Sequence, residues 1–182
     1  MLQTDIDNPG EPTKVWHGEY RGVTWEVNNF PMPENGRVFD QWCFYLLLAQ
    51  GMFPPERWPE IWLPPLIDEI GGRTMYRQNR GILGEIEWHG DCSFYQKRGG
   101  IDGKSQWVKA GCDYHHLSDV ENEAGQTLWN VLCDVKRAID SLRELIPDLR
   151  RCCWKTGKWY VEADGTFENG EFLSNEGRER EV

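Results

Sequence analysis

Hydrophobic and polar residues alternate in two short stretches near the start of the chain, which is the spacing of β-strands. Residues 15–20 and 23–27 place bulky side chains at every second position and flank the dipeptide Arg21-Gly22. Successive side chains of a strand point to opposite faces of a sheet, and a glycine-containing break between two such runs is typical of a tight turn. The pattern therefore predicts a β-hairpin over residues 15–27.

Two later stretches carry apolar residues at the three- and four-residue spacing of an α-helix. Residues 126–146 keep this spacing over a long run, and Pro147 follows directly. That run predicts a long amphipathic helix packed on a sheet. A shorter run begins at residue 39 and predicts a short buried helix that Gly51 ends. The apolar positions of the shorter run are Phe39, Trp42, Cys43, Leu46 and Leu47.

Three more stretches are rich in bulky, strand-forming residues. Residues 82–88, 92–96 and 106–110 each predict a strand, with a flexible basic hairpin tip over residues 97–104. Residues 154–161 predict a last strand or a small hairpin. The expected fold class is α+β: an antiparallel sheet of about five strands, one long amphipathic helix packed on it and a short second helix.

Turn-forming residues and charge set the expected domain organisation. Residues 1–14 contain Asn8-Pro9-Gly10 without apolar periodicity and predict a flexible N-terminal arm. Residues 15–161 form a single α+β domain, because a chain of 182 residues is within the usual size of one domain. Residues 162–182 are rich in glutamate and predict a solvated, acidic C-terminal tail.

Prolines and tryptophans are mixed over residues 53–66, which predicts a packed irregular loop that is a lid, an interface or a cover of the core.

Charge and cysteine content restrict the class of protein. Lys and Arg number 20 and Asp and Glu number 30, so the formal net charge is −10. Without a cationic excess, we expect no direct binding of nucleic acid and no attraction to a membrane surface. The chain has six cysteines and no secretory signal after Met1, so we expect reduced thiols in a cytoplasm. Its longest apolar stretch is far short of the roughly 20 residues that a membrane helix needs.

Two segments at predicted strand ends concentrate the residues that could carry chemistry. Trp88-His89-Gly90-Asp91-Cys92 and the segment over residues 111–119 hold three of the four histidines. Aromatic rings stack on a base and an arginine binds its phosphate, so a nucleotide-like ligand suits such a site. The residues predicted to bind it are His89, Asp113, Tyr114, His116, Asp119 and, from the hairpin tip, Arg98.

The same residues allow other chemistry. Imidazole and carboxylate groups bind zinc and other divalent transition metals, for which the candidate ligands are His89, Asp113, His116 and Asp119. Joint ligation by the last three requires a loop, because on a helix Asp119 falls on a different side. A histidine beside a carboxylate also suits acid–base catalysis, with Cys92 or Cys112 as a nucleophile. In a further alternative, His116 and Asp113 hydrogen-bond each other and hold a turn.

The two segments resemble a group of small phage and prophage accessory proteins. In that group a strand ends in His-Gly-Gly before a threonine or serine and an aromatic residue, and a Gly-aromatic-Asp-x-x-His-x-x-Asp segment precedes a helix. His89-Gly90 followed by Ser93 and by Phe94 or Tyr95 matches the first motif over part of its length. Asp91 and Cys112 depart from the pattern, at the second glycine and at the aromatic position. The second motif is matched at the same spacing by Gly111, Asp113, His116 and Asp119.

This resemblance implies a viral origin and a protein that acts against immunity in the cytoplasm of the bacterial host. The chain lacks the P-loop, dinucleotide-binding and zinc-protease signatures, which counts against a common enzyme class. We therefore expect a non-enzymatic, anti-CRISPR-like inhibitor, without a cofactor, that neutralises a host-defence protein or its nucleotide-like signal. A homo-oligomer is compatible with this function. The alternatives are a metal-dependent hydrolase of phosphodiesterase type and an acidic mimic of DNA.

Overall fold

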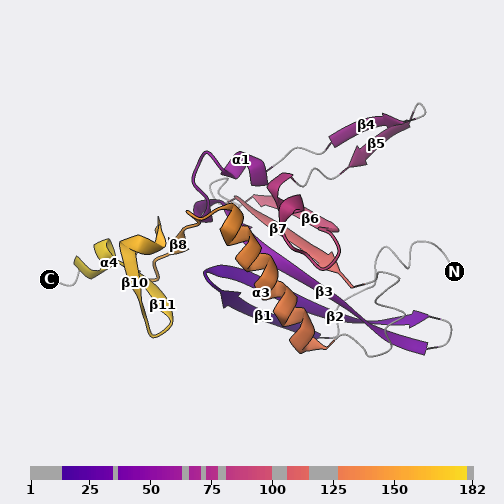
Figure 1. The fold of residues 1–182 in the computed structure, drawn as a ribbon, viewed down its shortest axis with the longest axis horizontal. Coiled ribbons are helices and arrows are strands. Elements are labelled where there is room, and N and C mark those ends of the chain that lie inside the picture. The colour runs from indigo at the N-terminus through magenta and orange to yellow at the C-terminus, as the bar shows by residue number, and fades with distance from the viewer. Residues whose placement is uncertain are drawn as a thin grey trace.

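The computed structural model describes residues 14–34, 37–62, 66–70, 73–77, 81–99, 106–114 and 127–179 (Figure 1). Its centre is a five-stranded antiparallel sheet with the strand order β1-β2-β3-β7-β6. The predicted α+β class and the antiparallel sheet of five strands are confirmed. The strands of this sheet are β1 (Lys14–Tyr20), β2 (Val23–Glu34), β3 (Arg37–Ala49), β6 (Phe94–Gly99) and β7 (Gln106–Asp113).

The predicted hairpin over residues 15–27 is confirmed, since β1 and β2 pair in antiparallel register. Its turn has positive φ at both Arg21 (48°) and Gly22 (80°), which is the turn geometry that matches the twist of two paired strands. A positive φ is unfavourable for arginine. Two contacts with the long helix hold it: Arg143 Nε donates to the Arg21 carbonyl at 2.9 Å, and Arg21 Nη1 lies 2.6 Å from Asp140 Oδ1.

The short helix predicted from residue 39 is wrong, because that stretch is the central strand β3. Cys43 and Phe44 are both buried although they point to opposite faces, and Leu46 and Leu48 are fully buried. A strand that is buried on both faces carries a nearly continuous apolar run, and such a run also fits helical spacing. Gly51 lies in a short 3-10 helix, η2 (Gln50–Met52), that follows the strand.

The strand predicted over residues 82–88 is also wrong, since Gly81–Glu85 form the 3-10 helix η3. Ile82, Leu83 and Ile86 are buried, and their spacing of three and four residues fits a helical turn. Strand β6 begins two residues later than predicted and continues to Gly99, into the stretch predicted as a hairpin tip. Strand β7 extends three residues beyond its predicted end at residue 110.

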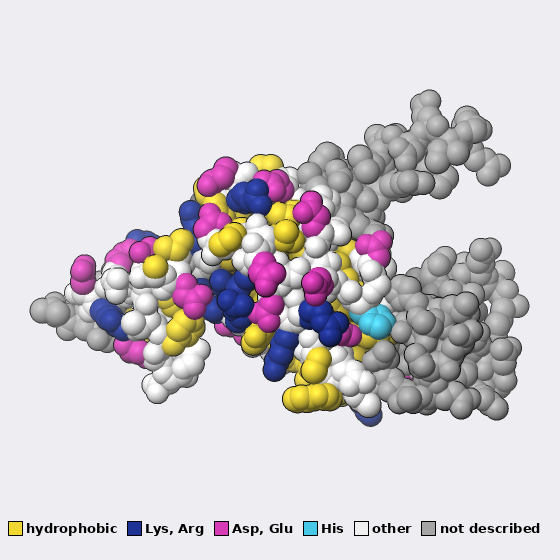
Figure 2. All heavy atoms as spheres, viewed as in Figure 1, with side chains coloured by type: hydrophobic (Ala, Val, Ile, Leu, Met, Phe, Trp, Pro, Cys, Tyr) yellow, Lys and Arg dark blue, Asp and Glu magenta, His cyan; other side chains and the backbone are white. Residues whose placement is uncertain are grey.

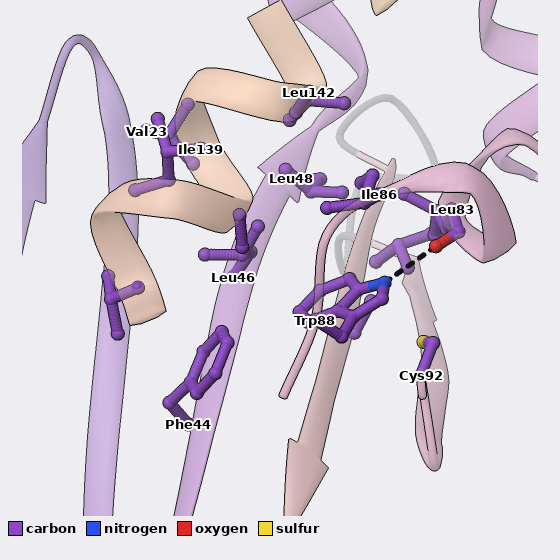
Figure 3. Close-up of a cluster of buried hydrophobic side chains, with 14 of the residues drawn as sticks. Val23, Phe44, Leu46, Leu48, Leu83, Ile86, Trp88, Cys92, Ile139 and Leu142 are labelled. Atoms are coloured by element: carbon purple, nitrogen blue, oxygen red, sulfur yellow. Dashed lines mark hydrogen bonds between the residues drawn. The ribbon is translucent and has the colours of Figure 1, made fainter. Parts of the chain in front are cut away.

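The predicted long helix is α3 (Leu128–Leu145). Its N-terminus is capped by Thr127, whose Oγ1 accepts a hydrogen bond from the Asn130 N–H at 3.3 Å. Figure 1 shows α3 crossing β1, β2 and β3, and Figure 3 shows Ile139 and Leu142 beside side chains of the sheet. One buried cluster contains both the apolar face of α3 and the facing residues of the sheet, and burial of each such side chain contributes about 1.5–3 kcal/mol. Its members include Val23, Val27, Leu46, Leu48, Val131, Val135, Ile139 and Leu142.

Short elements complete the core. The proline- and tryptophan-rich stretch contains α1 (Trp58–Ile61), and Phe53, Trp58 and Ile61 are buried, so this part of the loop covers the core. A separate hairpin that the sequence did not predict follows it, formed by β4 (Leu66–Ile70) and β5 (Arg73–Arg77).

Regular structure continues past α3. Strands β8 (Arg151–Cys152) and β9 (Trp159–Tyr160) form a small antiparallel pair, and η4 (Glu162–Asp164) follows. The stretch expected to be an acidic tail contains the hairpin of β10 (Gly165–Glu168) and β11 (Glu171–Ser174), and then α4 (Asn175–Glu179). Two apolar residues of this stretch, Phe172 and Leu173, pack with Cys153 in a second small core.

Candidate functional site

Trp88 anchors the chain immediately before His89. Its indole Nε1 donates a hydrogen bond to the carbonyl oxygen of Leu83 at 2.6 Å (Figure 3). Its ring stacks on Phe44 of β3 with the centroids 5.5 Å apart. A buried indole N–H requires an acceptor, so the bond to Leu83 fixes this segment against the sheet. His89 is thereby placed at the edge of the core.

His89 lies flat on Tyr114, which directly follows β7. The two ring centroids are 4.0 Å apart and the ring planes differ by 20°. The backbone N–H of Tyr114 donates to the carbonyl of Trp42 at 2.9 Å, so the pairing of β3 with β7 extends past Asp113. The two segments singled out in the sequence therefore meet through these two rings.

Asp134 of α3 is the charged centre of the arrangement. The Tyr114 hydroxyl donates to Asp134 Oδ2 at 2.7 Å, and His89 Nδ1 lies 3.4 Å from the same oxygen. Arg137 Nη1 donates to Asp134 Oδ1 at 2.9 Å. The Asp134 side chain is only 13% exposed, and a carboxylate in that position needs such partners to offset its lost hydration. We refer to His89, Tyr114, Asp134 and Arg137 as the histidine–aspartate cluster.

Asp134 and Arg137 are not among the site residues predicted from the sequence. Asp134 lies three residues after Val131 and four before Ala138, and both of these are fully buried. It therefore falls on the side of α3 that faces the sheet. An acidic residue at apolar spacing within an amphipathic helix is the signal that could have identified it.

Asp113 takes part in a separate contact. The Ser93 hydroxyl donates to Asp113 Oδ2 at 2.8 Å and accepts a hydrogen bond from the Asp113 backbone N–H at 3.2 Å. Neighbouring residues of an extended chain point to opposite faces, so Asp113 and Tyr114 leave β7 on different sides of the sheet. The carboxylate in contact with His89 is therefore that of Asp134. The carboxylate of Asp113 instead accepts a hydrogen bond from Ser93, which precedes β6.

Arg98 lies away from the cluster. It pairs with Trp107 of β7, six residues before Asp113. At about 3.3 Å per strand residue, this separates Arg98 from the end of β7 by roughly 20 Å. The structure therefore does not bring Arg98 together with His89 and Tyr114.

His116 and Asp119, which were predicted both as ligand-binding residues and as metal ligands, lie outside the described residues. Within the ranges that the structure describes, no group of three or more His, Cys, Asp or Glu side chains is arranged to hold a metal ion. Of the four metal candidates, His89 and Asp113 are described, and each has the separate contacts given above.

The cysteines beside the cluster are buried. Burial raises the pKa of the Cys112 thiol far above its ordinary value, and Cys92 is fully buried. A thiol is nucleophilic as its thiolate, and Cys112 is protonated at neutral pH. The position of Cys112 thus opposes the nucleophilic role considered for it from the sequence.

The arrangement leaves two groups at the surface that can contact a ligand. The His89 side chain is 26% exposed, and Arg137 is 58% exposed. Figure 2 shows lysine and arginine side chains gathered over the middle of the face that α3 occupies in Figure 1, bordered by acidic ones. An oriented imidazole ring beside a guanidinium suits a ligand that has both a flat ring and a negative charge.

Comparison of the chain with protein-family models, with curated proteins and with solved structures found no match. Among the described residues, no helix is both long and apolar enough to cross a lipid bilayer.

Proposed function

We propose that this chain is a non-enzymatic binding protein of the phage accessory type that it resembles, and that it neutralises a host defence by capturing a nucleotide-like signal. The ligand is held at the histidine–aspartate cluster. The observation that carries the proposal is the fixed pairing of a partly exposed ring, His89, with a partly exposed guanidinium, Arg137, on one buried carboxylate.

The His89 ring is held in place before any ligand arrives. One face lies on Tyr114 and its Nδ1 edge faces Asp134, so the ring has little rotational freedom left to lose. A base that stacks on the exposed part of the His89 ring would gain contact area at a small entropic cost, because every base has a flat π-face.

Arg137 supplies the charge for a phosphate group. One of its nitrogens donates to Asp134 Oδ1, and a guanidinium carries five N–H donors, so donors remain available for an outer partner. Arginine presents these donors in a planar fork that matches phosphate oxygens. The bond to Asp134 holds this fork on the same carboxylate that His89 faces.

Titration calorimetry of the full chain with a panel of cyclic and linear nucleotides tests the proposal. We expect at least one nucleotide to bind, and we expect Arg137→Gln and His89→Ala each to weaken that binding by about tenfold or more, the equivalent of 1.4 kcal/mol. The matched control is Arg178→Gln, which removes an exposed arginine that pairs with Glu168 in the C-terminal part and should leave affinity unchanged.

Two results would contradict the proposal. One is that no nucleotide of the panel binds. The other is that Arg137→Gln binds as well as the unaltered chain. If the chain instead captures an effector protein from a bacterial lysate while all nucleotides fail, the neutralised component is a protein, and the nucleotide site is wrong.

A further inference from the structure

Two buried arginines meet where the end of α3 joins the C-terminal part of the chain. Arg143 lies in the last turn of α3 and Arg151 lies in β8, and the side chain of each is only 6% exposed. A buried guanidinium has lost its hydration, so it requires acceptors for its N–H groups and a negative charge nearby. The contacts of these two side chains therefore show which of these requirements the protein itself meets.

Arg143 has firm acceptors for two of its three nitrogens. Its Nε and Nη2 both donate to the carbonyl oxygen of Arg21, at 2.9 and 2.6 Å. Its Nη1 faces Glu162 Oε2 at 3.5 Å, an ion pair that is longer than a strong charge-assisted hydrogen bond. The Arg21 carbonyl thus holds the guanidinium in place, and the Nη1 edge remains directed toward Glu162.

Arg151 is less well satisfied. Its Nε is buried and has no hydrogen-bond acceptor among the described residues, although it forms an ion pair with the same oxygen, Glu162 Oε2, at 3.3 Å. Its guanidinium lies over the Phe167 ring, 4.8 Å from the centroid. Its Nη1 lies against Gly22, where an added Cβ atom would be 2.6 Å away. The aromatic ring and the glycine give the guanidinium a fixed place, but neither contact satisfies its Nε.

The charges around the two arginines do not balance. The ion pairs of the described residues join three positive charges here, on Arg21, Arg143 and Arg151, with two negative charges, on Asp140 and Glu162. Arg21 and Asp140 pair directly at 2.6 Å, which leaves one carboxylate for two buried guanidinium groups. Burial and, next, the charge of Arg151 lower the pKa of Arg143. Additional negative charge at this place would therefore be stabilising.

Glu162 is the only carboxylate among the described residues that pairs with Arg143 and Arg151, and it is loosely held. Its side chain is 46% exposed and comes from the short helix η4. Its two ion pairs are long, and a carboxylate that is already half-exposed regains water easily, so its displacement costs little. The position of Glu162 Oε2 shows where a single oxygen meets both guanidinium groups.

We propose that Arg143 and Arg151 together bind a small oxyanion of the phosphate type, which replaces Glu162 between the two guanidinium groups. Once Glu162 moves aside, the pair carries two positive charges, which a phosphate dianion neutralises. Phosphate oxygens also match the planar fork of donors that arginine presents. Glu162 is then an internal competitor of the anion.

This oxyanion site is separate from the histidine–aspartate cluster. Arg143 lies six residues beyond Arg137, which is about 9 Å along α3 and on a different side of the helix. The outcome of the experiments below therefore does not depend on whether a nucleotide binds at the cluster.

Titration calorimetry of the full chain with inorganic phosphate, at an ionic strength held constant with sodium chloride, is the first test. We expect a Kd of about 1 mM or tighter, and we expect Glu162→Gln to bind about tenfold more tightly because the competing carboxylate is gone. The matched control is Glu168→Gln, which removes a glutamate of similar exposure (50%) that pairs with Arg178 and should leave the affinity unchanged. The inference is overturned if phosphate does not bind, or if Glu162→Gln binds it no more tightly than the unaltered chain.

Thermal unfolding separates an anion site from a purely structural role of Glu162. Without phosphate, Glu162→Gln should melt below the unaltered chain, because two buried arginines lose their carboxylate. Phosphate at about 10 mM should close this difference, since a ligand that binds only the folded state stabilises it. If phosphate raises the melting temperature of Glu162→Gln no more than that of Glu168→Gln, Glu162 serves packing alone and the proposal is wrong.

Two arginine variants test the position of the anion. Arg151→Lys keeps a positive charge but lacks the planar fork, and it should weaken phosphate binding by about tenfold. Arg137→Gln, at the histidine–aspartate cluster, should retain phosphate binding. Loss of binding in Arg137→Gln, with full binding in a folded Arg151→Lys, would place the anion at the cluster and overturn the inference.

Titration with glycerol 3-phosphate, a small phosphate monoester, distinguishes two sources of the anion. Binding as tight as that of inorganic phosphate would identify the terminal phosphate group of a larger molecule as the ligand. Binding of inorganic phosphate alone would identify the free anion. Either result supports the oxyanion site, and failure of both compounds to bind would contradict it.

Discussion

The Tyr114 hydroxyl and the Asp134 carboxylate are joined by a buried hydrogen bond of 2.7 Å. Tyr114 follows the last residue of β7, and Asp134 lies in the first half of α3, so the bond connects the sheet to the long helix. The same carboxylate meets His89 and Arg137. One hydrogen bond therefore supports both the packing of α3 and the orientation of the histidine–aspartate cluster.

Replacement of Tyr114 by phenylalanine removes this bond and keeps the ring. A hydrogen bond to a charged, buried group contributes about 1.5–3 kcal/mol, so we expect the free energy of unfolding to fall by that amount. Urea denaturation followed by tryptophan fluorescence measures it. Tyr20→Phe is the matched control, because the Tyr20 hydroxyl is 3.4 Å from Asp140 Oδ2 and only partly buried. If both variants lose the same free energy of unfolding, the buried Tyr114 bond stabilises the fold no more than the partly buried Tyr20 bond does.

Gly111 allows β7 to pair closely with β3. A Cβ atom added at Gly111 would lie 2.2 Å from the backbone carbonyl oxygen of Phe44, which cannot move without breaking the sheet register. Gly111→Ala should therefore destabilise the fold by about 1–3 kcal/mol in urea denaturation. On the neighbouring strand β6, Gly99→Ala meets nothing within 4 Å and should change stability by less than about 0.5 kcal/mol. An unchanged stability of Gly111→Ala would contradict the close approach of β7 to the Phe44 carbonyl.

Two of the elements that the sequence predicts correctly have one buried side. The β1–β2 hairpin and α3 each have an exposed side, so their polar and apolar residues separate cleanly along the chain. Strand β3 is buried on both faces around Cys43 and Phe44, and its apolar run carries no period that distinguishes a strand from a helix. Its identity depends on pairing with β2, its neighbour in the chain, and with β7, which is distant in sequence.

The sequence likewise predicts one part of the candidate site and misses another. The sequence singles out the two segments that meet through His89 and Tyr114, although only Tyr114 follows a strand. Spacing can place Asp134 on the sheet-facing side of α3, but its contact with His89 forms only when α3 packs on the sheet. The sequence predicts Arg98 at a flexible tip, whereas the residue lies in strand β6, away from the site.

Trp88 provides a test of how the site is supported from the core. Trp88→Phe keeps an aromatic ring beside Phe44 but leaves the Leu83 carbonyl without its indole donor. We expect a loss of about 1–3 kcal/mol in the free energy of unfolding and a change in the NMR signals of the adjacent His89 ring. Trp154→Phe, at an exposed position, should change neither. Unchanged His89 signals in Trp88→Phe would show that the histidine is held by Tyr114 and Asp134 alone.

Buried thiol and phenol groups give the fold a characteristic dependence on pH. Burial raises the pKa of the Cys43 thiol to about 12, against an ordinary value of 9.0. Burial also raises the pKa values of Cys112 and of Tyr45. Above pH 9 the unfolded chain releases these protons while the folded chain retains them. The unfolded state therefore binds fewer protons, and stability falls as the pH rises.

We expect the free energy of unfolding to decline above about pH 9. The limiting slope is about 1.4 kcal/mol per pH unit for each buried group that remains protonated in the folded state. Urea denaturation at a series of pH values measures this slope. Cys43→Ala should be less stable at pH 7 because it leaves a small cavity, but its decline above pH 9 should be shallower than that of the unaltered chain. Cys133→Ala, at an exposed position, should keep the full slope. An equal slope in the two variants would show that Cys43 ionises as readily in the folded chain as in the unfolded one.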